Sequence, residues 1–316
     1  MVTAPFLQSA GRLICWLHQI TGTSPEEFCL LKIRLFILIC TLFTGPALAA
    51  SGCNSKGECI DTGQWRVAAA VGAGGRTNPL RGGSTQSLVL IGDIAWYAES
   101  FYFDNFELGY QWQSNQPGLS VDAYLVIDRE ARPFFSYEGF DATPAELFSR
   151  EQLAVTPAAE ANTEINVDSI ADRRNGGHAG VRLHAGSSPA NEWQFSVEKD
   201  IAGIHQGVKA RIAWRFSHRW QKWLFSVSPQ LVWNNRTFND YYYGIDGKDT
   251  PDKRLWYSAG SGFRPGVNVA VTRQFNKHWG LLAFTRYQYL PDAVTESPLL
   301  TGHDILTVFT GLTYQF

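Results

Sequence analysis

The residues of this chain with the most catalytic potential are two pairs of sequence neighbours. Ser217 stands beside His218, and His303 stands beside Asp304. A hydrolase needs a nucleophile, a base and an orienting acid within hydrogen-bond reach of one another. Adjacent residues of a β-strand point to opposite faces, so neither pair can act together on a strand. We therefore expect no catalytic residues and no enzyme activity.

The spacing of the histidines, carboxylates and cysteines does not indicate a metal or cofactor site either. His178, His184 and His205 are not spaced as metal ligands with carboxylates or cysteines. The sequence contains no G-x-S-x-G, H-E-x-x-H or P-loop motif. The spacing therefore predicts no metal site and no cofactor.

The N-terminal region has the pattern of a secretory signal peptide. Lys32 and Arg34 precede the short apolar run 35–43, and Ala47-Leu48-Ala49 provides a small-residue cleavage site. We expect the region 1–49 to be removed on export. Because a signal should begin close to the start of a chain, we interpret residues 1–30 as a misassigned start.

Two of the five cysteines follow this signal, in a short N-terminal periplasmic segment at 50–64. Cys53 and Cys59 lie six residues apart, and no cysteine follows them. In an oxidising compartment this pair predicts a small disulfide loop. Lipid modification of Cys53 is the alternative interpretation.

Composition narrows the class of protein further. The 316 residues are 45% hydrophobic and 14% aromatic but only 18% charged, whereas soluble domains average about 25% charged. The apolar content excludes disorder of the whole chain, and a net charge of −2 gives no reason to expect nucleic acid as a partner. A helical membrane protein needs runs of about 20 apolar residues, and the signal region is the one segment that approaches this length.

From about residue 65 the chain alternates between apolar and polar residues, which is the pattern of half-buried strands. These segments run about 10 residues, as a tilted bilayer crossing requires, whereas strands of a sandwich usually have 5–6. Aromatic residues flank short turns at Phe216 and Trp220 and at Phe275 and Trp279, as in an interfacial girdle. The pattern favours an all-β fold, a closed antiparallel transmembrane β-barrel over residues 65–316, rather than a soluble secreted β-sandwich.

The number of strands follows from parity. The alternation marks eleven segments, near 65–74, 87–97, 102–112, 119–127, 177–185, 191–199, 207–216, 222–236, 257–275, 280–290 and 305–316. A single-chain bacterial barrel needs an even number, so we place a twelfth strand near Pro133–Tyr137; ten strands is the alternative. Short connections near 98–101, 128–132, 186–190, 217–221 and 276–279 would then face the periplasm. The long ones, 139–176, 237–256 and 291–304, would face outside.

One set of charged residues shares the polar face of two neighbouring segments. Lys209, Arg211 and Arg215 stand opposite Glu192 and Glu198. Opposite charges at cross-strand positions predict internal ion pairs in the lumen. A charge-selective pore lined by these residues is the alternative, because a lumen of about twelve strands lies between filled and open barrels in size.

Several motifs in the last third resemble those of a known family. They are the run Asn239-Asp240-Tyr241-Tyr242-Tyr243-Gly244, the segments 256–262 and 290–293, Glu296-Ser297-Pro298-Leu299, and the ending 311–316 with Tyr314 and Phe316 as a C-terminal barrel signal. With these motifs the chain resembles the MipA/OmpV family of outer-membrane proteins, over most of residues 65–316. We interpret the tyrosines as an interfacial girdle, with a recognition surface as the alternative, and Ser297-Pro298 as a turn.

The resemblance implies a scaffold in the Gram-negative outer membrane that links murein hydrolases and synthases by binding, without catalytic residues. The expected partners are outer-membrane lipids, the barrel-assembly machinery, a lytic transglycosylase and a penicillin-binding protein. A small-solute channel and a surface-loop adhesin, using loops 139–176 and 237–256, are the alternative functions.

Overall fold

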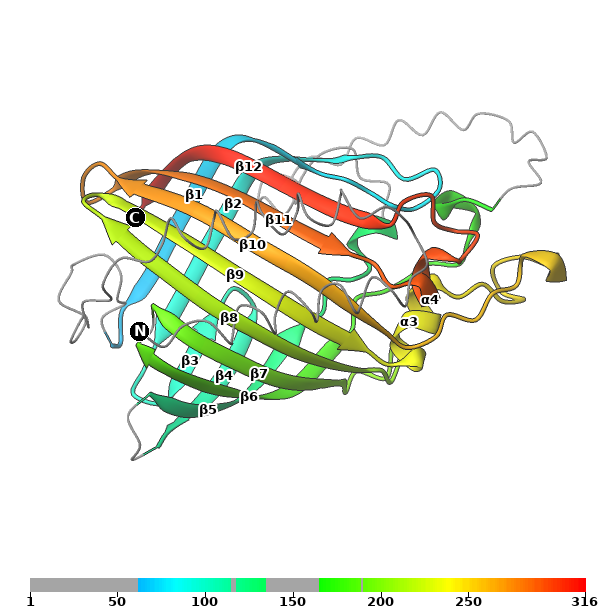
Figure 1. The fold of residues 1–316 in the computed structure, drawn as a ribbon, viewed down its shortest axis with the longest axis horizontal. Coiled ribbons are helices and arrows are strands. Elements are labelled where there is room, and N and C mark those ends of the chain that lie inside the picture. Colours follow the sequence, from blue (N-terminus) through cyan, green and yellow to red (C-terminus); the bar gives the residue numbers. More distant parts are fainter. Residues whose placement is uncertain (1–61, 115–117, 135–164, 189) are drawn as a thin grey trace, which may run out of the picture. The chain divides into compact units, whose positions relative to one another are not determined.

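A computed structural model describes residues 62–114, 118–134, 165–188 and 190–316. In this part of the chain, twelve antiparallel strands close into a barrel in which β1 pairs with β12 (Figure 1). The strands are β1 (Trp65–Arg76), β2 (Gln86–Tyr97), β3 (Phe101–Asp104), β4 (Glu107–Gln113), β5 (Leu119–Ile127), β6 (Gly177–Ser188), β7 (Asn191–Asp200), β8 (Val208–Trp220), β9 (Trp223–Asn234), β10 (Gly262–Gln274), β11 (Trp279–Tyr289) and β12 (Asp304–Gln315). The predicted closed, twelve-stranded barrel is confirmed. Among the described residues, no helix is long and apolar enough to cross a membrane.

Along most strands the exposed side chains are apolar and the buried ones polar, although Ala70, Leu88 and Phe309 form a small buried apolar cluster. In β7, Trp193, Phe195 and Val197 are 41–56% exposed, whereas Gln194 and Ser196 are 8% exposed. Water would disfavour this inverted pattern, since each exposed apolar side chain forgoes about 1.5–3 kcal/mol of burial. A hydrocarbon solvent removes that penalty, and closure leaves no free edge between the first and last strands.

The twelfth strand does not lie where the sequence pattern placed it. The predicted strand 102–112 is a hairpin of β3 and β4, joined by Asn105 and Phe106 with φ angles of 48° and 71°. Pro133 belongs to the short helix η1 (Arg132–Phe134), and residues 135–137 lie outside the described residues. The strand near Pro133 was therefore a wrong assignment, although the total of twelve was right.

Because of this hairpin, the connection 128–132 lies at the other end of the barrel from the one that the sequence predicted. The described short turns, such as 98–100, 221–222 and 275–278, share one end, which we call the short-turn end. Residues 128–132 lie at the opposite, long-loop end, because Ile127 pairs with Gly177 and the Asp128 amide donates to the Gly176 carbonyl at 2.8 Å. The prediction that 128–132 is a short periplasmic turn is wrong.

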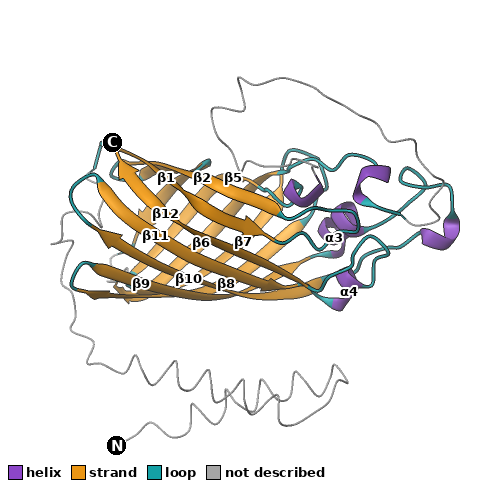
Figure 2. Ribbon diagram, turned by 90° about the horizontal axis from the view of Figure 1, so that it is seen from above, coloured by secondary structure: helices purple, strands orange, loops and turns teal. Residues whose placement is uncertain are grey.

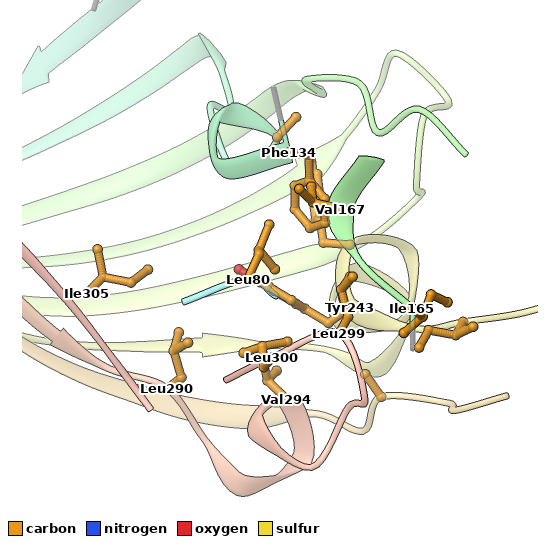
Figure 3. Close-up of a cluster of buried hydrophobic side chains, with 14 of the residues drawn as sticks. Leu80, Phe134, Ile165, Val167, Tyr243, Leu290, Val294, Leu299, Leu300 and Ile305 are labelled. Carbon is orange, nitrogen blue, oxygen red and sulfur yellow. The ribbon is translucent and has the colours of Figure 1, made fainter. Parts of the chain in front are cut away.

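The described helices gather at the long-loop end (Figure 2). They are η1, η3 (Val167–Ser169), α3 (Arg236–Tyr243), η4 (Lys253–Leu255) and α4 (Asp292–Thr295). With the loops around them they bury one continuous apolar core (Figure 3), formed by Leu80, Ala131, Phe134, Ile165, Val167, Phe238, Tyr242, Tyr243, Ile245, Ala259, Leu290, Val294, Leu299, Leu300 and Ile305. We call these packed loops, 77–85, 128–134, 165–176, 235–261 and 290–303, the cap. The cap is a folded core at one end of the barrel.

Candidate functional site in the lumen and cap

The lumen brings the predicted charged residues together, but with different partners. The register pairs Glu198 with Lys209 and Glu192 with Arg215, as the sequence implied. Lys209 Nζ nevertheless lies 3.0 Å from Asp128 Oδ1 and 3.9 Å from Glu198 Oε2, so its shorter contact is to Asp128. The main partner of Lys209 therefore comes from the end of β5, not from the neighbouring strand.

Glu192 also finds its partner on another strand. Its carboxylate bonds Nδ1 of His184, and Nε2 of the same ring lies 2.7 Å from Asp122 Oδ2. Nearby, Arg182 forms two parallel hydrogen bonds with Glu107, at 2.7 and 2.8 Å. Because both ring nitrogens of His184 face carboxylates, this histidine keeps no free lone pair for general-base chemistry. The cluster is a set of satisfied charges.

Two of the predicted lumen cations have no direct partner. Arg211 stands opposite Ser196 in the register, and Arg215 stands opposite Glu192, which bonds His184. Within the described ranges, neither guanidinium group makes a hydrogen bond or an ion pair. These two guanidinium groups are the part of the lumen best suited to attract an anion.

A polar hollow of about 360 Å³ lies beside this cluster, toward the short-turn end. Gln111, Ser120, His184, Ser188 and Glu192 contribute to its lining. The residues come from β4, β5, β6 and β7, so the hollow is part of the lumen wall. The cap core fills the other, long-loop end of the barrel.

A second histidine cluster lies under the cap. His178 Nε2 is 3.1 Å from His205 Nε2 and 3.7 Å from Asp128 Oδ2. Both histidine side chains are fully buried. Sequence reasoning missed this cluster because its members lie 50 and 27 residues apart, on β6 and on the connections after β5 and β7, and no motif spacing links them.

The tyrosine motif forms the helix α3 within the cap. Asn235 caps this helix, since its side chain accepts a hydrogen bond from the Phe238 amide at 3.0 Å. Tyr242 and Tyr243 are 0% and 1% exposed. The interpretation of these two tyrosines as an interfacial girdle is therefore wrong, because a girdle residue must contact lipid.

The other motif residues hold α3 to neighbouring loops. Asn239 Nδ2 donates to the Gly260 carbonyl at 2.7 Å, and Asp240 Oδ1 accepts from the Ala259 amide at 2.9 Å. The Ser297 hydroxyl donates to the Tyr243 carbonyl at 2.7 Å. The tyrosine run and the Ser-Pro segment, which are far apart in sequence, are thus one structural unit.

Tyr243 also belongs to a buried charge cluster of the cap. Its hydroxyl donates to Glu130, and Arg264 Nη1 lies 2.7 Å from Glu130 Oε1. Burial alone would raise the pKa of Glu130, but Arg264, Tyr243 and Lys209 outweigh burial and lower that pKa to about 2. Burial and the Glu130 carboxylate raise the pKa of Tyr243. Glu130 is therefore ionised and Tyr243 is neutral.

The remaining predicted residues lie outside these clusters. Cys53 and Cys59 fall outside the described residues. Tyr314 is on β12 with its ring 5.0 Å from that of Phe316, which is 75% exposed. The Phe316 amide donates to the Val67 carbonyl at 2.9 Å, so the last residue lies at the seam between β12 and β1.

Sequence comparison decides the family. The family model described as "MltA-interacting protein MipA" matches residues 69–316. The chain belongs to the MipA family. It is similar to the MltA-interacting protein of Escherichia coli, with 28% identity over 142 residues, which are 42% of this chain and 56% of that protein. The match thus spans about half the length of that relative.

Other relatives are named as outer-membrane proteins. The outer membrane protein OmpV of Vibrio cholerae is 22% identical over 289 residues, 90% of this chain and 99% of that protein. Among solved structures, the translocator domain of the autotransporter NalP from Neisseria meningitidis covers 92% of this chain, with 96% of its own length, 12% identity and a TM-score of 0.32. This MipA-family chain is an outer-membrane β-barrel, and its relatives are named as interacting or outer-membrane proteins rather than as enzymes.

Proposed function

We propose that the barrel is a membrane anchor that holds a murein hydrolase at the outer membrane by binding. The observation that supports this most directly is the cap, which fills the long-loop mouth with a buried apolar core. A barrel filled in this way is suited to anchoring rather than to free diffusion of solutes. A relative carries the name MltA-interacting protein, which agrees with binding as the activity.

The docking surface in this proposal is the short-turn end, which should face the periplasm because barrels have short periplasmic turns. The turns after β8 and β10 carry the exposed lysines Lys222 and Lys277. Arg273 lies beside them, with its guanidinium 4.9 Å from the Trp223 ring centre. Trp223 pairs with Arg273 across β9 and β10, so the two turns form one basic, aromatic surface. Such a surface fits an acidic face on a soluble partner.

The proposal also covers export, membrane insertion and the binding partners of the chain. Residues 1–49 direct export, the barrel-assembly machinery inserts residues 65–316, and outer-membrane lipids surround the exposed apolar band. The bound partner is a lytic transglycosylase, and through it a penicillin-binding protein. A disulfide between Cys53 and Cys59 belongs to the same export route, as such bridges form in the periplasm.

The experiment compares two charge-reversal variants in a capture assay. The full chain is solubilised from envelopes in detergent after mild cross-linking, and co-purifying murein enzymes are quantified by mass spectrometry. We expect Lys222→Glu with Lys277→Glu to reduce recovery of a lytic transglycosylase at least tenfold. The matched control, Lys248→Glu with Lys253→Glu, changes the same charge in the cap and should bind as the wild type does. Equal recovery from both variants would contradict this docking surface, and no transglycosylase above an unrelated-barrel control would contradict the anchor function.

Arg211 and Arg215 favour a second candidate, an anion-selective pore. Their guanidinium groups lack direct partners among the described residues, and Glu192, which stands opposite Arg215, lines the polar hollow. A pore should conduct ions in a planar bilayer, and Arg211→Glu should shift its selectivity toward cations. An anchor with a filled cap should conduct little, and Arg211→Glu should change nothing measurable. The two functions therefore give opposite results in one assay.

A further inference from the structure

The cluster under the cap has the donor atoms of a metal site. Asp128 follows β5, His178 is on β6, and His205 lies in the connection between β7 and β8. One donor atom from each residue lies within 4.8 Å of the others. All three residues are buried, so three separate segments of the chain bring nitrogen and oxygen ligands to one enclosed point.

The distances suit a small tetrahedral ion. With metal–nitrogen bonds of about 2.0–2.1 Å, two ligands of a tetrahedral site lie about 3.3 Å apart. The His178 Nε2 to His205 Nε2 distance of 3.1 Å and the His178 Nε2 to Asp128 Oδ2 distance of 3.7 Å lie on either side of this value. Two imidazoles and one carboxylate are ligands that zinc accepts.

Two of the ligands are oriented by partners behind them. His178 Nδ1 lies 3.3 Å from Glu198 Oε2, and donation of the Nδ1 proton to Glu198 leaves the Nε2 lone pair directed into the site. Lys209 Nζ donates a hydrogen bond to Asp128 Oδ1 at 3.0 Å. The other oxygen, Asp128 Oδ2, is buried and has no hydrogen-bond partner among the described residues. A buried carboxylate oxygen without a partner is costly, and a metal ion would satisfy it.

His205 needs one adjustment to bind. Its Nδ1 accepts a hydrogen bond from the Gly207 amide at 2.9 Å, which places the ring proton on Nε2, toward His178. Metal binding at Nε2 requires that proton to move to Nδ1. Asp200 Oδ2, 4.0 Å from Nδ1, is the carboxylate that can then accept it. Loss of the Gly207 hydrogen bond weakens binding, but it leaves a second histidine–carboxylate pair of the kind that supports metal ligands.

The local charge does not oppose a cation at this place. The carboxylates of Asp128, Glu198 and Glu130 outnumber the cations Lys209 and Arg264 in the connected ion-pair network by one. A divalent ion changes this local sum from −1 to +1, so the magnitude of the local net charge is the same with the ion as without it. The phenyl ring of Phe238, 5.0 Å from the His205 ring centre, helps to exclude water.

We propose that Asp128, His178 and His205 bind a divalent transition-metal ion, with Zn²⁺ as the best match to two imidazoles and one carboxylate. The ion fixes the connection between β7 and β8 and the segment after β5 to the strand β6, directly beneath α3. We assign it a structural role because all three ligand residues are buried. The opposing interpretation, a hydrogen-bond chain from Gly207 through both histidines to Glu198 without an ion, is an outcome of the test.

The test titrates Zn²⁺ into the full-length chain, purified without a histidine tag and stripped with a chelator. We expect one zinc per chain by elemental analysis, a raised thermal midpoint, and no displacement by excess Mg²⁺ or Ca²⁺. His178→Ala and His205→Ala should each weaken binding by at least tenfold. Glu198→Gln, which alters the residue behind His178, should weaken it by about 10–100-fold. The exposed histidine variant His303→Ala should bind as the wild type does.

Two further measurements distinguish loss of the zinc site from loss of folding. Heat-modifiable migration on gels shows whether each variant forms a barrel, and X-ray absorption of the wild-type zinc complex counts imidazole ligands without any substitution. Two imidazoles support the proposal. Absence of zinc binding to the wild type, binding that survives both histidine substitutions, or binding lost instead in His184→Ala would overturn it. Preference for Ca²⁺ or Mg²⁺ would overturn it too.

Discussion

The Glu130 carboxylate should be a main electrostatic support of the cap. It accepts hydrogen bonds from Arg264 and Tyr243, and its side chain is 13% exposed. We predict that Glu130→Gln, which keeps the shape of the side chain but removes the charge, destabilises the cap. The substitution leaves the Arg264 guanidinium, 5% exposed, without its counter-ion, and a buried charge that loses its partner is strongly unfavourable.

The pKa of Glu130 sets the magnitude. A pKa lowered from the ordinary value of 4.5 to about 2 corresponds to about 3 kcal/mol of stability at pH 7. Because the folded state holds the lower pKa, this contribution is complete above about pH 5 and is lost as the pH falls toward 2. At pH 3, midway, about 2 kcal/mol of it should be gone. The Gln variant should lack this part of the pH dependence.

Hydrogen exchange in detergent micelles measures the effect locally. Amides of residues 236–245 report opening of the cap, and about 3 kcal/mol corresponds to exchange about 100-fold faster at pH 7. Glu296→Gln is the matched control, since this cap carboxylate is exposed, and it should exchange as the wild type does. Exchange of Glu130→Gln within threefold of the wild type, or the same acid dependence in both proteins, would refute the assignment of Glu130 as a support of the cap.

Two other substitutions and one deletion test the fold. Ser297→Ala removes the donor to the Tyr243 carbonyl and should cost about 1–2 kcal/mol, seen as faster exchange in the same peptides. Asn105→Ala loses hydrogen bonds to β2, including that to Asp93, and places alanine at φ 48°, so the free energy of unfolding in urea should fall by about 1–2 kcal/mol; an unchanged free energy would contradict a stabilising role for Asn105. Deletion of Phe316 removes the amide that bonds β1, and the assembled, heat-modifiable fraction should fall at least twofold.

The sequence predicted the barrel well because a strand in lipid must repeat its pattern every two residues. The alternation at Trp193, Phe195 and Val197 was sufficient to assign both the strand and its outward face. The β3–β4 hairpin was missed for a local reason. Its two-residue turn is Asn105-Phe106, without the glycine that usually marks such a turn, and aromatic residues continue on both sides.

The partners of the charged residues were predictable only in part. A cross-strand pattern predicts which residues stand opposite each other, as Glu198 and Lys209 do. It does not predict that Glu192 reaches His184, which is a diagonal neighbour on β6 rather than the residue directly opposite, or that Lys209 reaches Asp128, which follows a strand that is not adjacent to β8. The cap has no periodicity at all, since its core comes from single residues of many loops.

The motif that carries the family resemblance is therefore a device for folding the cap. Tyr243 and Ser297 bond each other, and Asp240 bonds the loop before β10, so these three motif residues are used within the chain. A buried side chain that is already satisfied cannot also recognise a partner. In the proposed function, the partner is therefore contacted by residues outside the motif. Lys222 and Lys277 are the residues that the proposal assigns to this contact, because they are exposed at the opposite end of the barrel, on turns outside the cap.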